Sequence, residues 1–170
     1  MAFRRHSESR GRKLKLSEAL VEKFAMSKVG YWSLLHVAPR VDKVIIPRTN
    51  GRLSASGIDK VGLLTSTGAK SGAERVQPLV CIDFDEDSIL LIGSNYGREK
   101  HPAWTHNLMA NPDCTLEFRG DPAPYTARML EDEEYDRAWE LAVDFYAGYA
   151  NYKTNCAPRR IRIARLDPSS

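Results

Sequence analysis

The chain has 170 residues, of which 42% are hydrophobic and 28% are charged, and its formal net charge is +3. This composition is typical of a soluble globular domain. It excludes disordered and membrane-spanning chains, because no apolar run approaches the roughly 20 residues of a spanning helix. Residues 1–15 hold six basic residues and one acidic residue, so the rest of the chain is slightly acidic. No nucleic-acid partner is expected for the folded part, since a binding face would itself carry positive charge.

The N-terminal third predicts two regions before the main domain. Residues 1–16 form a flexible basic tail, and residues 17–60 contain an amphipathic helix and a linker. The helix is indicated by Ser17 as N-cap and by an apolar stripe at helical spacing that ends before Gly30. Two interpretations stay open. Either residues 1–37 lie peripherally on the anionic inner face of a membrane, or the helix covers the core of its own domain.

The cysteines indicate the compartment. Cys81, Cys114 and Cys156 form no CxxC pair, and we expect Cys81 and Cys114 to be buried in strands as free thiols of a reducing compartment. No apolar signal-peptide core follows Arg4 and Arg5, so a cytoplasmic location is expected.

Residues 61–170 predict an α+β domain dominated by antiparallel strands. Short apolar runs predict strands at residues 62–67, 76–84, 88–93, 114–119, 125–130 and 160–166, with a tight turn at 85–87. Helical patterns occupy residues 101–110 and 132–146. Strands with helices inserted between them predict a small barrel or a strongly curled sheet. Without βαβ alternation or a GxGxxG motif, a Rossmann site is not supported.

A turn at residues 64–78, with the sequence LTSTGAKSGAERVQP, has the composition of an anion site. Gly68 and Gly72 permit positive φ and a close approach of backbone amides, and Lys70 and Arg75 add two cations. Phosphate is the anion that suits this set best. The alternative is an ordinary solvated hairpin loop. A Walker A loop is excluded, because Ala69 separates Gly68 from Lys70.

The sequence contains none of the usual hydrolytic or metal-binding motifs. Its four histidines have no metal-ligand spacing, and the HExxH and GxSxG patterns are absent. Cofactor chemistry or pure binding remains. In FYAGYANY, Tyr146, Tyr149 and Tyr152 stand three apart at the end of the second helix, so they can converge as a wall of phenols; the alternative is core packing. Trp104 suits an aromatic ligand or packing, and Asn107 follows it by one turn.

These motifs, taken in order, carry a resemblance. LTSTGAKSGAERVQPLV, IGSNYGREKHPAWTHNLMANPDC, FYAGYANY and RRIRIARLDP resemble the deazaflavin-dependent nitroreductase family of split β-barrel reductases, over about residues 61–168. The family binds coenzyme F-420, an 8-hydroxy-5-deazaflavin with a phosphate and a polyglutamate tail. It uses the reduced form as hydride donor to quinones, enones and nitroaromatic compounds. The resemblance therefore implies a split β-barrel and an oxidoreductase.

The resemblance also implies a set of site residues. The phosphate would be held by Lys70, Ser71 and Arg75 next to Ala69, and the strand residues Val76, Gln77, Pro78, Leu79 and Val80 would run along the coenzyme. The deazaflavin would be lined by Ile92, Gly93, Ser94 and Asn95 and packed by Ala103, Trp104, Thr105, His106 and Asn107. Tyr146, Tyr149 and Tyr152 would surround the coenzyme and the electron acceptor.

The chain departs from the family pattern at three positions. Ala69 and Asn95 replace cations that other members carry, and Val80 stands where the nitroreductase prototype has a tyrosine. The departure at Val80 concerns nitroimidazole reduction more than coenzyme binding.

A deazaflavin carries electrons as hydride, so the protein needs to bind it, align an acceptor, exclude water and supply hydrogen bonds. Our hypothesis is that Ser94 and Tyr149 polarise the acceptor oxygen and that a tyrosine, such as Tyr146 or Tyr149, or water delivers the proton. Two alternatives remain. One is a non-catalytic protein that binds a deazaflavin, tetrapyrrole or lipid, and the other is a split-barrel reductase that uses FMN. The physiological acceptor and the oligomeric state stay open.

Overall fold

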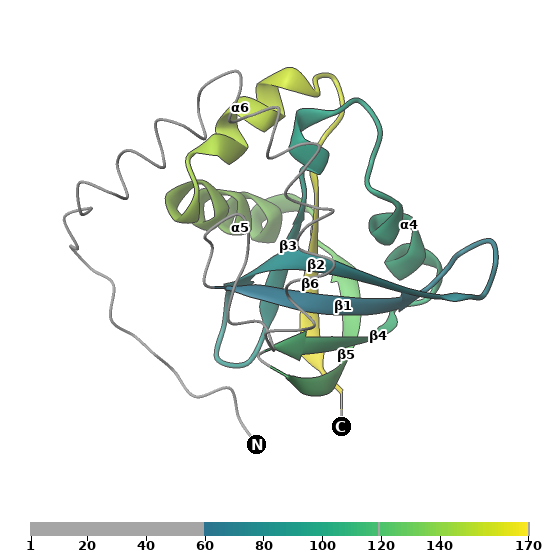
Figure 1. The fold of residues 1–170 in the computed structure, drawn as a ribbon. Helices are drawn as coiled ribbons and strands as arrows, with labels where there is room; N and C mark the ends of the chain where they lie inside the picture. Colours follow the sequence, from purple (N-terminus) through teal and green to yellow (C-terminus); the bar gives the residue numbers. More distant parts are fainter. Residues whose placement is uncertain (1–59, 119, 170) are drawn as a thin grey trace, which may run out of the picture.

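A computed structural model describes residues 60–118 and 120–169 (Figure 1). The predicted basic tail and N-terminal amphipathic helix lie outside these residues. Within the described part, no helix has both the length and the apolar character needed to cross a bilayer.

The described residues form an antiparallel barrel with inserted helices, which confirms the predicted α+β fold. The strands are β1 (Val61–Thr67), β2 (Glu74–Asp83), β3 (Ile89–Gly93), β4 (Asp113–Phe118), β5 (Asp121–Met129) and β6 (Arg162–Pro168). The helices are α4 (Ala103–Ala110), α5 (Asp132–Phe145) and α6 (Gly148–Asn155), with a 3-10 turn, η1 (Asn95–Gly97), after β3. The strand order around the barrel is β1-β2-β3-β6-β5-β4, and pairing of β1 with β4 closes it.

Strand β3 shows how the sequence builds two apolar layers. Its buried residues Ile89 and Leu91 belong to the barrel interior, whereas Leu90 and Ile92 pack on the outside against α5 and α6. Successive side chains of a strand point to opposite faces, so a strand buried on both faces reads as a continuous apolar run. The sequence ILLIG therefore marks the strand that both layers share.

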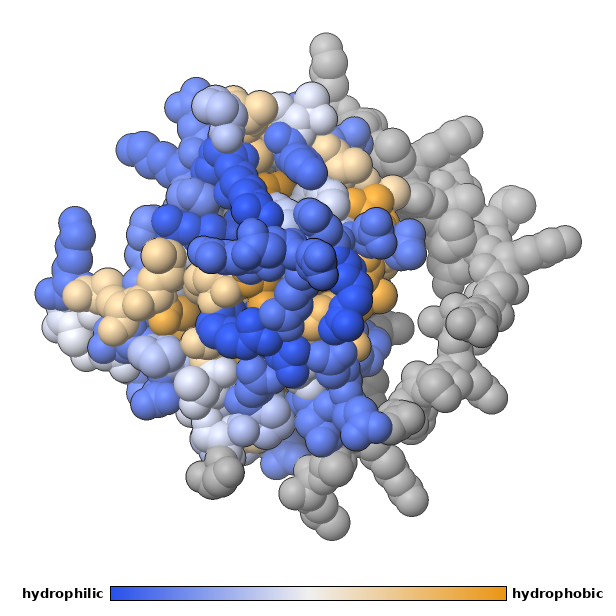
Figure 2. Space-filling model, turned by 180° about the vertical axis from the view of Figure 1, so that it is seen from behind, coloured by the Kyte–Doolittle hydropathy of each residue, from blue (hydrophilic) through white to orange (hydrophobic). Residues whose placement is uncertain are grey.

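The outer layer is a single cluster, which we call the outer cluster. It joins strands β2, β3 and β6 to α5 and α6, and its buried members are Ile82, Leu90, Ile92, Leu130, Tyr135, Ala138, Ala142, Tyr149, Tyr152, Cys156, Ile161 and Ile163. Ala138 and Ala142 are fully buried, because their small side chains let α5 lie close to the barrel. In Figure 1, α5 and α6 lie one above the other on the same side of the barrel. From behind, Figure 2 shows a broad hydrophilic area in the centre, with apolar residues between its parts and at its edges.

Several predicted features are confirmed. Cys81 and Cys114 are buried in β2 and β4 as free thiols. Residues 85–87 form the tight turn between β2 and β3, in which the Phe84 N–H donates to the Ser88 carbonyl at 3.1 Å.

The prediction that β5 begins at residue 125 was wrong, because the strand begins at Asp121 and includes Pro122 and Pro124. At these prolines β5 pairs only with β4, and its pairing with β6 begins at Tyr125. Proline is tolerated at these positions because, in the described ladders, they lie outside the pairing with β6, where a missing N–H would remove a ladder hydrogen bond.

The predicted second helix also differs. It ends at Phe145, and the chain breaks at Tyr146 (φ −149°, ψ 105°) before a separate helix, α6, begins at Gly148. The spacing of three had predicted one continuous helix for Tyr146, Tyr149 and Tyr152. The break at Tyr146 shows that this prediction was wrong.

Candidate functional site

The turn between β1 and β2 carries the predicted anion site. Gly72 has φ +64°, as the sequence predicts, but a positive φ does not occur at Gly68, where a Cβ would instead meet the Ser71 hydroxyl at 2.8 Å. The Gly68 N–H donates to the Ala73 carbonyl at 2.9 Å, and the Gly72 N–H donates to the Gly68 carbonyl at 2.8 Å. The amides of these two glycines thus form hydrogen bonds that close the turn itself.

The cations of the turn remain available to a ligand. Lys70 and Arg75 are exposed, and neither forms an ion pair within residues 60–118 and 120–169. Ser71 orients Arg75, whose Nη2 donates to the Ser71 hydroxyl at 3.5 Å. An anion would therefore be bound by side-chain cations rather than by a backbone cradle.

Asn107 attaches helix α4 to this turn. Its Oδ1 accepts a hydrogen bond from the Ala69 N–H at 3.1 Å, and its Nδ2 donates to the Ser66 hydroxyl at 3.3 Å. Asn107 is 9% exposed, and both ends of its amide are satisfied. The structure thus brings together two segments that the sequence placed at the site separately.

The other predicted residues of α4 divide between core and surface. Trp104 is 3% exposed and packs in the barrel interior with Leu108, so the packing interpretation of this ring is the one that the structure supports. Thr105 is fully buried and donates to the Pro102 carbonyl at 2.9 Å. Ala103 and His106 are exposed. The expectation that Trp104 also borders the coenzyme stays a prediction.

The predicted coenzyme strand, β2, presents alternate residues to its two faces. Val80 packs against the outer cluster, so Val76 and Pro78 lie on that same outer face. Leu79 packs against the barrel interior, and Gln77 shares its side. Val76 is 51% exposed although apolar. The outer face of β2 thus leads from the cationic turn to the outer cluster.

The segment after β3 adopts an uncommon backbone. Asn95, Tyr96 and Gly97 have φ values of 48°, 56° and 73°, and each non-glycine residue in this region costs about 1–3 kcal/mol. We call residues 95–97 the left-handed turn. Its Asn95 side chain donates to the Lys100 carbonyl at 2.8 Å. Such cost is retained only where surrounding contacts fix the conformation.

Close packing explains the glycine of this turn and the one at the end of β3. A Cβ at Gly97 would lie 3.1 Å from the Tyr152 Cα, so only glycine lets the turn approach α6. A Cβ at Gly93 would lie 2.8 Å from the Arg162 carbonyl. Ile92 and Ser94, on either side of Gly93, are 8% and 9% exposed.

The three predicted tyrosines converge, although two elements supply them. We call Tyr146, Tyr149 and Tyr152 the tyrosine cluster. The ring centroids of Tyr146 and Tyr149 are 5.5 Å apart, and that of Tyr152 lies 6.2 Å and 6.1 Å from these two. Tyr149 is 6% exposed, and burial, with Tyr146 adding to the effect, raises the pKa of its phenol above the ordinary value of 10.0. The Tyr149 hydroxyl therefore stays protonated at physiological pH and can donate a hydrogen bond.

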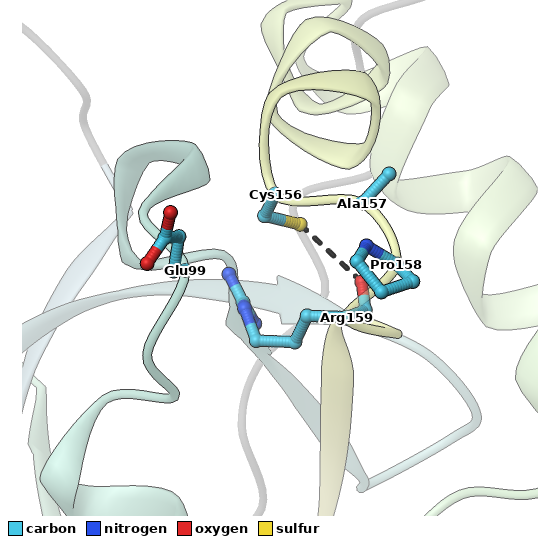
Figure 3. A pocket seen from close by; sticks show the side chains of 5 residues that line it. All are labelled: Glu99, Cys156, Ala157, Pro158 and Arg159. Carbon is cyan, nitrogen blue, oxygen red and sulfur yellow. Dashed lines mark hydrogen bonds between the residues drawn. The ribbon is translucent and has the colours of Figure 1, made fainter.

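Sequence reasoning missed two contributors to this region. Tyr96 lies on the left-handed turn with its ring centroid 6.3 Å from that of Tyr152, and its place in the SNYG motif was the available signal. Arg159 donates to the carbonyls of Gly93, Ser94 and Arg98, and no pattern in the sequence indicated this role. Arg159 also lines a cavity of about 400 Å³ with Glu99, Cys156, Ala157 and Pro158 (Figure 3).

Comparison with known proteins now decides the family. A family model described as F420H(2)-dependent quinone reductase matches residues 39–166. A relative from Mycobacterium tuberculosis that is named an F420H(2)-dependent quinone reductase is 31% identical over 134 residues, which cover 74% of this chain and 89% of the relative.

The chain belongs to the F420H(2)-dependent quinone reductase family.

Two solved structures support this family assignment. One is described as an F420-H2 dependent reductase; it is 37% identical, has a TM-score of 0.57, and the match covers 63% of this chain and 93% of that one. The other, described as a domain-swapped dimer, is 30% identical, has a TM-score of 0.60, and the match covers 83% of this chain and all of that one. As a member of the F420H(2)-dependent quinone reductase family, the chain is an oxidoreductase that uses coenzyme F-420. The resemblance read from the sequence motifs is confirmed.

Proposed function

We propose that the chain reduces a quinone at a surface formed by four parts: the cationic turn with Lys70 and Arg75, the outer face of β2, the segment after β3 and the tyrosine cluster. One observation carries this assignment: Val80 of β2 and Tyr149 of α6 pack in the same outer cluster. The strand that starts at the cationic turn therefore leads to the cluster that contains Tyr149 and Tyr152. The two sets of predicted site residues lie along one face of the barrel.

The residues present fit coenzyme F-420. Lys70 and Arg75 suit a phosphate, and the half-exposed Val76 suits the apolar flank of a ring system. The Gln77 Nε2 is buried without a hydrogen-bond partner in the described part of the chain. This donor lies on the inner face of β2, on the side of Leu79, so it is not among the groups that face the proposed surface.

The reduced coenzyme supplies a hydride when it is bound. The chain's own residues then hold it, align the acceptor beside it and stabilise the negative charge that forms on the acceptor oxygen. Ser94 and Tyr149 are the donors that we assign to that oxygen. Tyr149 remains protonated because of its burial, so it can donate a hydrogen bond to that oxygen. A tyrosine, such as Tyr146, or water delivers the one proton that completes the reduction.

The function is tested by titrating the protein separately with oxidised coenzyme F-420, FMN and haem, and then by assaying the reduced coenzyme with menadione. We expect saturable binding of the deazaflavin in preference to FMN and haem, and reduction of menadione. Tight deazaflavin binding without turnover would support the non-catalytic alternative. Preference for FMN would support the FMN-dependent reductase.

The phosphate assignment has its own variant. Replacing Lys70 and Arg75 together with alanine removes two charge-assisted bonds, so we expect the Kd for the oxidised coenzyme to rise about 100-fold or more. Lys60→Ala is the control, because Lys60 is an exposed lysine already paired with Asp83 at 2.6 Å. Equal Kd values for the double variant and this control would remove the cationic turn from the site.

We also propose, from the sequence alone, that residues 1–37 attach the chain to an anionic membrane surface through basic residues followed by an apolar helical stripe. The test is cosedimentation with anionic liposomes at low and high salt. Binding should fall with salt and with deletion of residues 1–16. Unchanged sedimentation after that deletion would contradict the proposal.

A further inference from the structure

One arginine outside the predicted site residues holds the segment that carries Ser94. The guanidinium of Arg159 donates from Nη2 to the Ser94 carbonyl at 2.8 Å and to the Arg98 carbonyl at 2.9 Å. Its Nη1 donates to the Gly93 carbonyl at 3.2 Å, and its Nε donates to the Arg98 carbonyl at 3.1 Å. Three backbone carbonyls on one segment are therefore bound by one side chain.

These carbonyls flank the left-handed turn on both sides. Gly93 and Ser94 precede it and Arg98 follows it, so Arg159 clamps the two ends of the segment in which Asn95, Tyr96 and Gly97 have positive φ. Hydrogen bonds from a charged donor are stronger than those between neutral groups. Arg159 thus supplies contacts that such a costly backbone requires.

The remaining bond of Arg159 fits the same role. Its Nη1 lies 3.4 Å from the Nδ1 of His101, which can accept only when the imidazole is neutral. Burial, together with the charges of Arg162 and Arg159, lowers the pKa of His101 below its ordinary value of 6.5, so this ring is neutral at pH 7. The nearby carboxylate of Glu99 lines the same cavity, yet the described residues show no ion pair between it and Arg159 (Figure 3).

The clamp determines where the peptide N–H groups of the segment point. A trans peptide is planar, with its C=O and N–H directed oppositely. Because Arg159 holds the carbonyls of Gly93 and Ser94, the N–H groups of Ser94 and Asn95 point away from the guanidinium. The chain position of Arg159 matters as well, since it lies between α6 and β6 and so ties this segment to the connection that follows the tyrosine cluster.

We propose that Arg159 is a positioning residue for the reductase: it fixes the left-handed turn so that Ser94 and Asn95 meet the coenzyme and the acceptor in one geometry. This inference rests on the proposed function. Arg159 acts in it through the protein, by the hydrogen bonds of its guanidinium to the segment after β3.

The first experiment is hydrogen exchange on the protein without coenzyme, for the parent, Arg159→Met, Arg159→Lys and Arg128→Met. The Gly97 and Arg98 amides donate to the carbonyls of Ser94 and Asn95, so they report on the turn. We expect their exchange to accelerate about tenfold or more in Arg159→Met, which loses bonds to a charged donor. Arg128→Met removes an arginine bound to Glu134 instead and should leave these amides unchanged.

The second experiment measures turnover of reduced coenzyme F-420 with menadione by the same variants. A misplaced segment should lower kcat about 100-fold in Arg159→Met while changing the Kd of the oxidised coenzyme much less. Arg159→Lys should recover part of kcat, because a lysine can still donate to one of the carbonyls.

The proposal is overturned if Gly97 and Arg98 exchange at the parent rate in Arg159→Met, if kcat is unchanged, or if Arg128→Met shows the same losses. A parent protein that does not reduce menadione would instead contradict the proposed function. Exchange in the coenzyme-free variants would still decide whether Arg159 fixes the turn. If Arg159→Met does not fold, Arg159→Lys provides both measurements.

Discussion

Single residues at the site act through what burial does to them. Burial raises the pKa of the Tyr149 phenol, so its hydroxyl keeps its proton at physiological pH and suits the proposed donor role. Ser94 is 9% exposed, and its carbonyl accepts a hydrogen bond from Arg159. Its hydroxyl is the group that we propose to donate to the oxygen of the electron acceptor. At this scale the proposed site is a pair of neutral donors rather than a nucleophile and a base.

Tyr149→Phe tests the donor role. It removes one hydroxyl and keeps the ring, so we expect kcat/KM with menadione to fall roughly 100-fold, as when one preorganised donor is lost. Ser94→Ala should lower the same constant for the same reason. Steady-state kinetics of both variants provide the measurement.

The matched control is Tyr135→Phe. Tyr135 is another buried tyrosine of the outer cluster, and its hydroxyl has no hydrogen-bond partner among the described residues. The guanidinium of Arg160 stacks over its ring, 3.8 Å from the centroid. Parent-like kcat/KM in Tyr149→Phe and Ser94→Ala would show that neither hydroxyl polarises the acceptor.

At the scale of elements, the site depends on how α4 and α6 are attached. The side-chain amide of Asn107 joins helix α4 to the turn between β1 and β2, and α6 meets the left-handed turn through a glycine contact. Both attachments join segments far apart in the sequence. A substitution at either attachment should therefore change ligand binding at the segment that it joins, even though the substituted residue lies far from that segment in the sequence.

Asn107→Leu tests the attachment of α4. The variant leaves the Ala69 N–H and the buried Ser66 hydroxyl without their partner, so we expect the free energy of unfolding to fall by about 1–3 kcal/mol. Because the cationic turn loses its link to α4, the Kd for the oxidised coenzyme should rise about tenfold. Urea denaturation and fluorescence titration are the two measurements.

Asn111→Ala provides the control for this variant. Asn111 follows α4, and from an exposed position its side chain donates to the Thr67 carbonyl at 3.4 Å. We therefore expect its replacement to lower the free energy of unfolding by no more than about 1 kcal/mol. A coenzyme Kd that is equal in the two variants would argue against a role for Asn107 at the site.

Gly148→Ala tests the placement of the tyrosine cluster. A Cβ at this position would collide with the ring of Tyr146, which must therefore move away. We expect the KM for menadione to rise several-fold while the Kd for the oxidised coenzyme stays within about twofold of the parent. Tyr146→Ala should have the same effect, and the double variant should be no worse than either single one. Additive effects of the two substitutions would show that the ring of Tyr146 is not the cause.

Elements formed by interactions between residues close in the sequence could be predicted, whereas features formed by residues far apart could not. The barrel strands could be predicted because runs such as Ile89–Gly93 carry their own apolar pattern and turn signals. The sequence could not decide the role of Trp104, since packing in a barrel interior and contact with an aromatic ligand both favour a large aromatic side chain. The break at Tyr146 was missed because a period of three suits one helix or two. Arg159 was missed because its partners are backbone carbonyls 61–66 residues away, and backbone groups leave no mark in a sequence.

At the scale of the whole molecule, an ion-pair network joins elements on the barrel surface. Arg165 of β6 lies 2.8 Å from both Asp85 and Glu134, and its Nε donates to Asp167 at 2.7 Å. Arg128 of β5 forms two 2.7 Å bonds with Glu134. Glu134 of α5 thus accepts hydrogen bonds from arginines on two strands, β5 and β6. The bonds from Arg128, followed by those from Arg165, lower the pKa of Glu134 from 4.5 to about 2.

Because of this shift in pKa, the free energy of unfolding should depend on pH over a defined range. A carboxylate with a depressed pKa in the folded state stabilises fully above its unfolded value of 4.5, and it loses this contribution as the pH falls through about 2. Glu134→Gln should therefore lower the free energy of unfolding by about 1 kcal/mol at pH 7, the range of a partly exposed network. The difference from the parent should shrink between pH 4.5 and pH 2. Urea unfolding at several pH values measures it, and a difference independent of pH would contradict the role of the charge.

Strand β6 occupies the position between β3 and β5, so the barrel has its full circumference only when this strand is in place. A nascent chain that lacks residues 162–168 presents two unpaired strand edges at once, one on each side of the gap. Edges of this kind recruit strands from other molecules. Premature termination just upstream of β6 would therefore yield a self-associating species instead of a less active monomer, and protection of those edges during synthesis becomes a requirement of the cell that makes the protein.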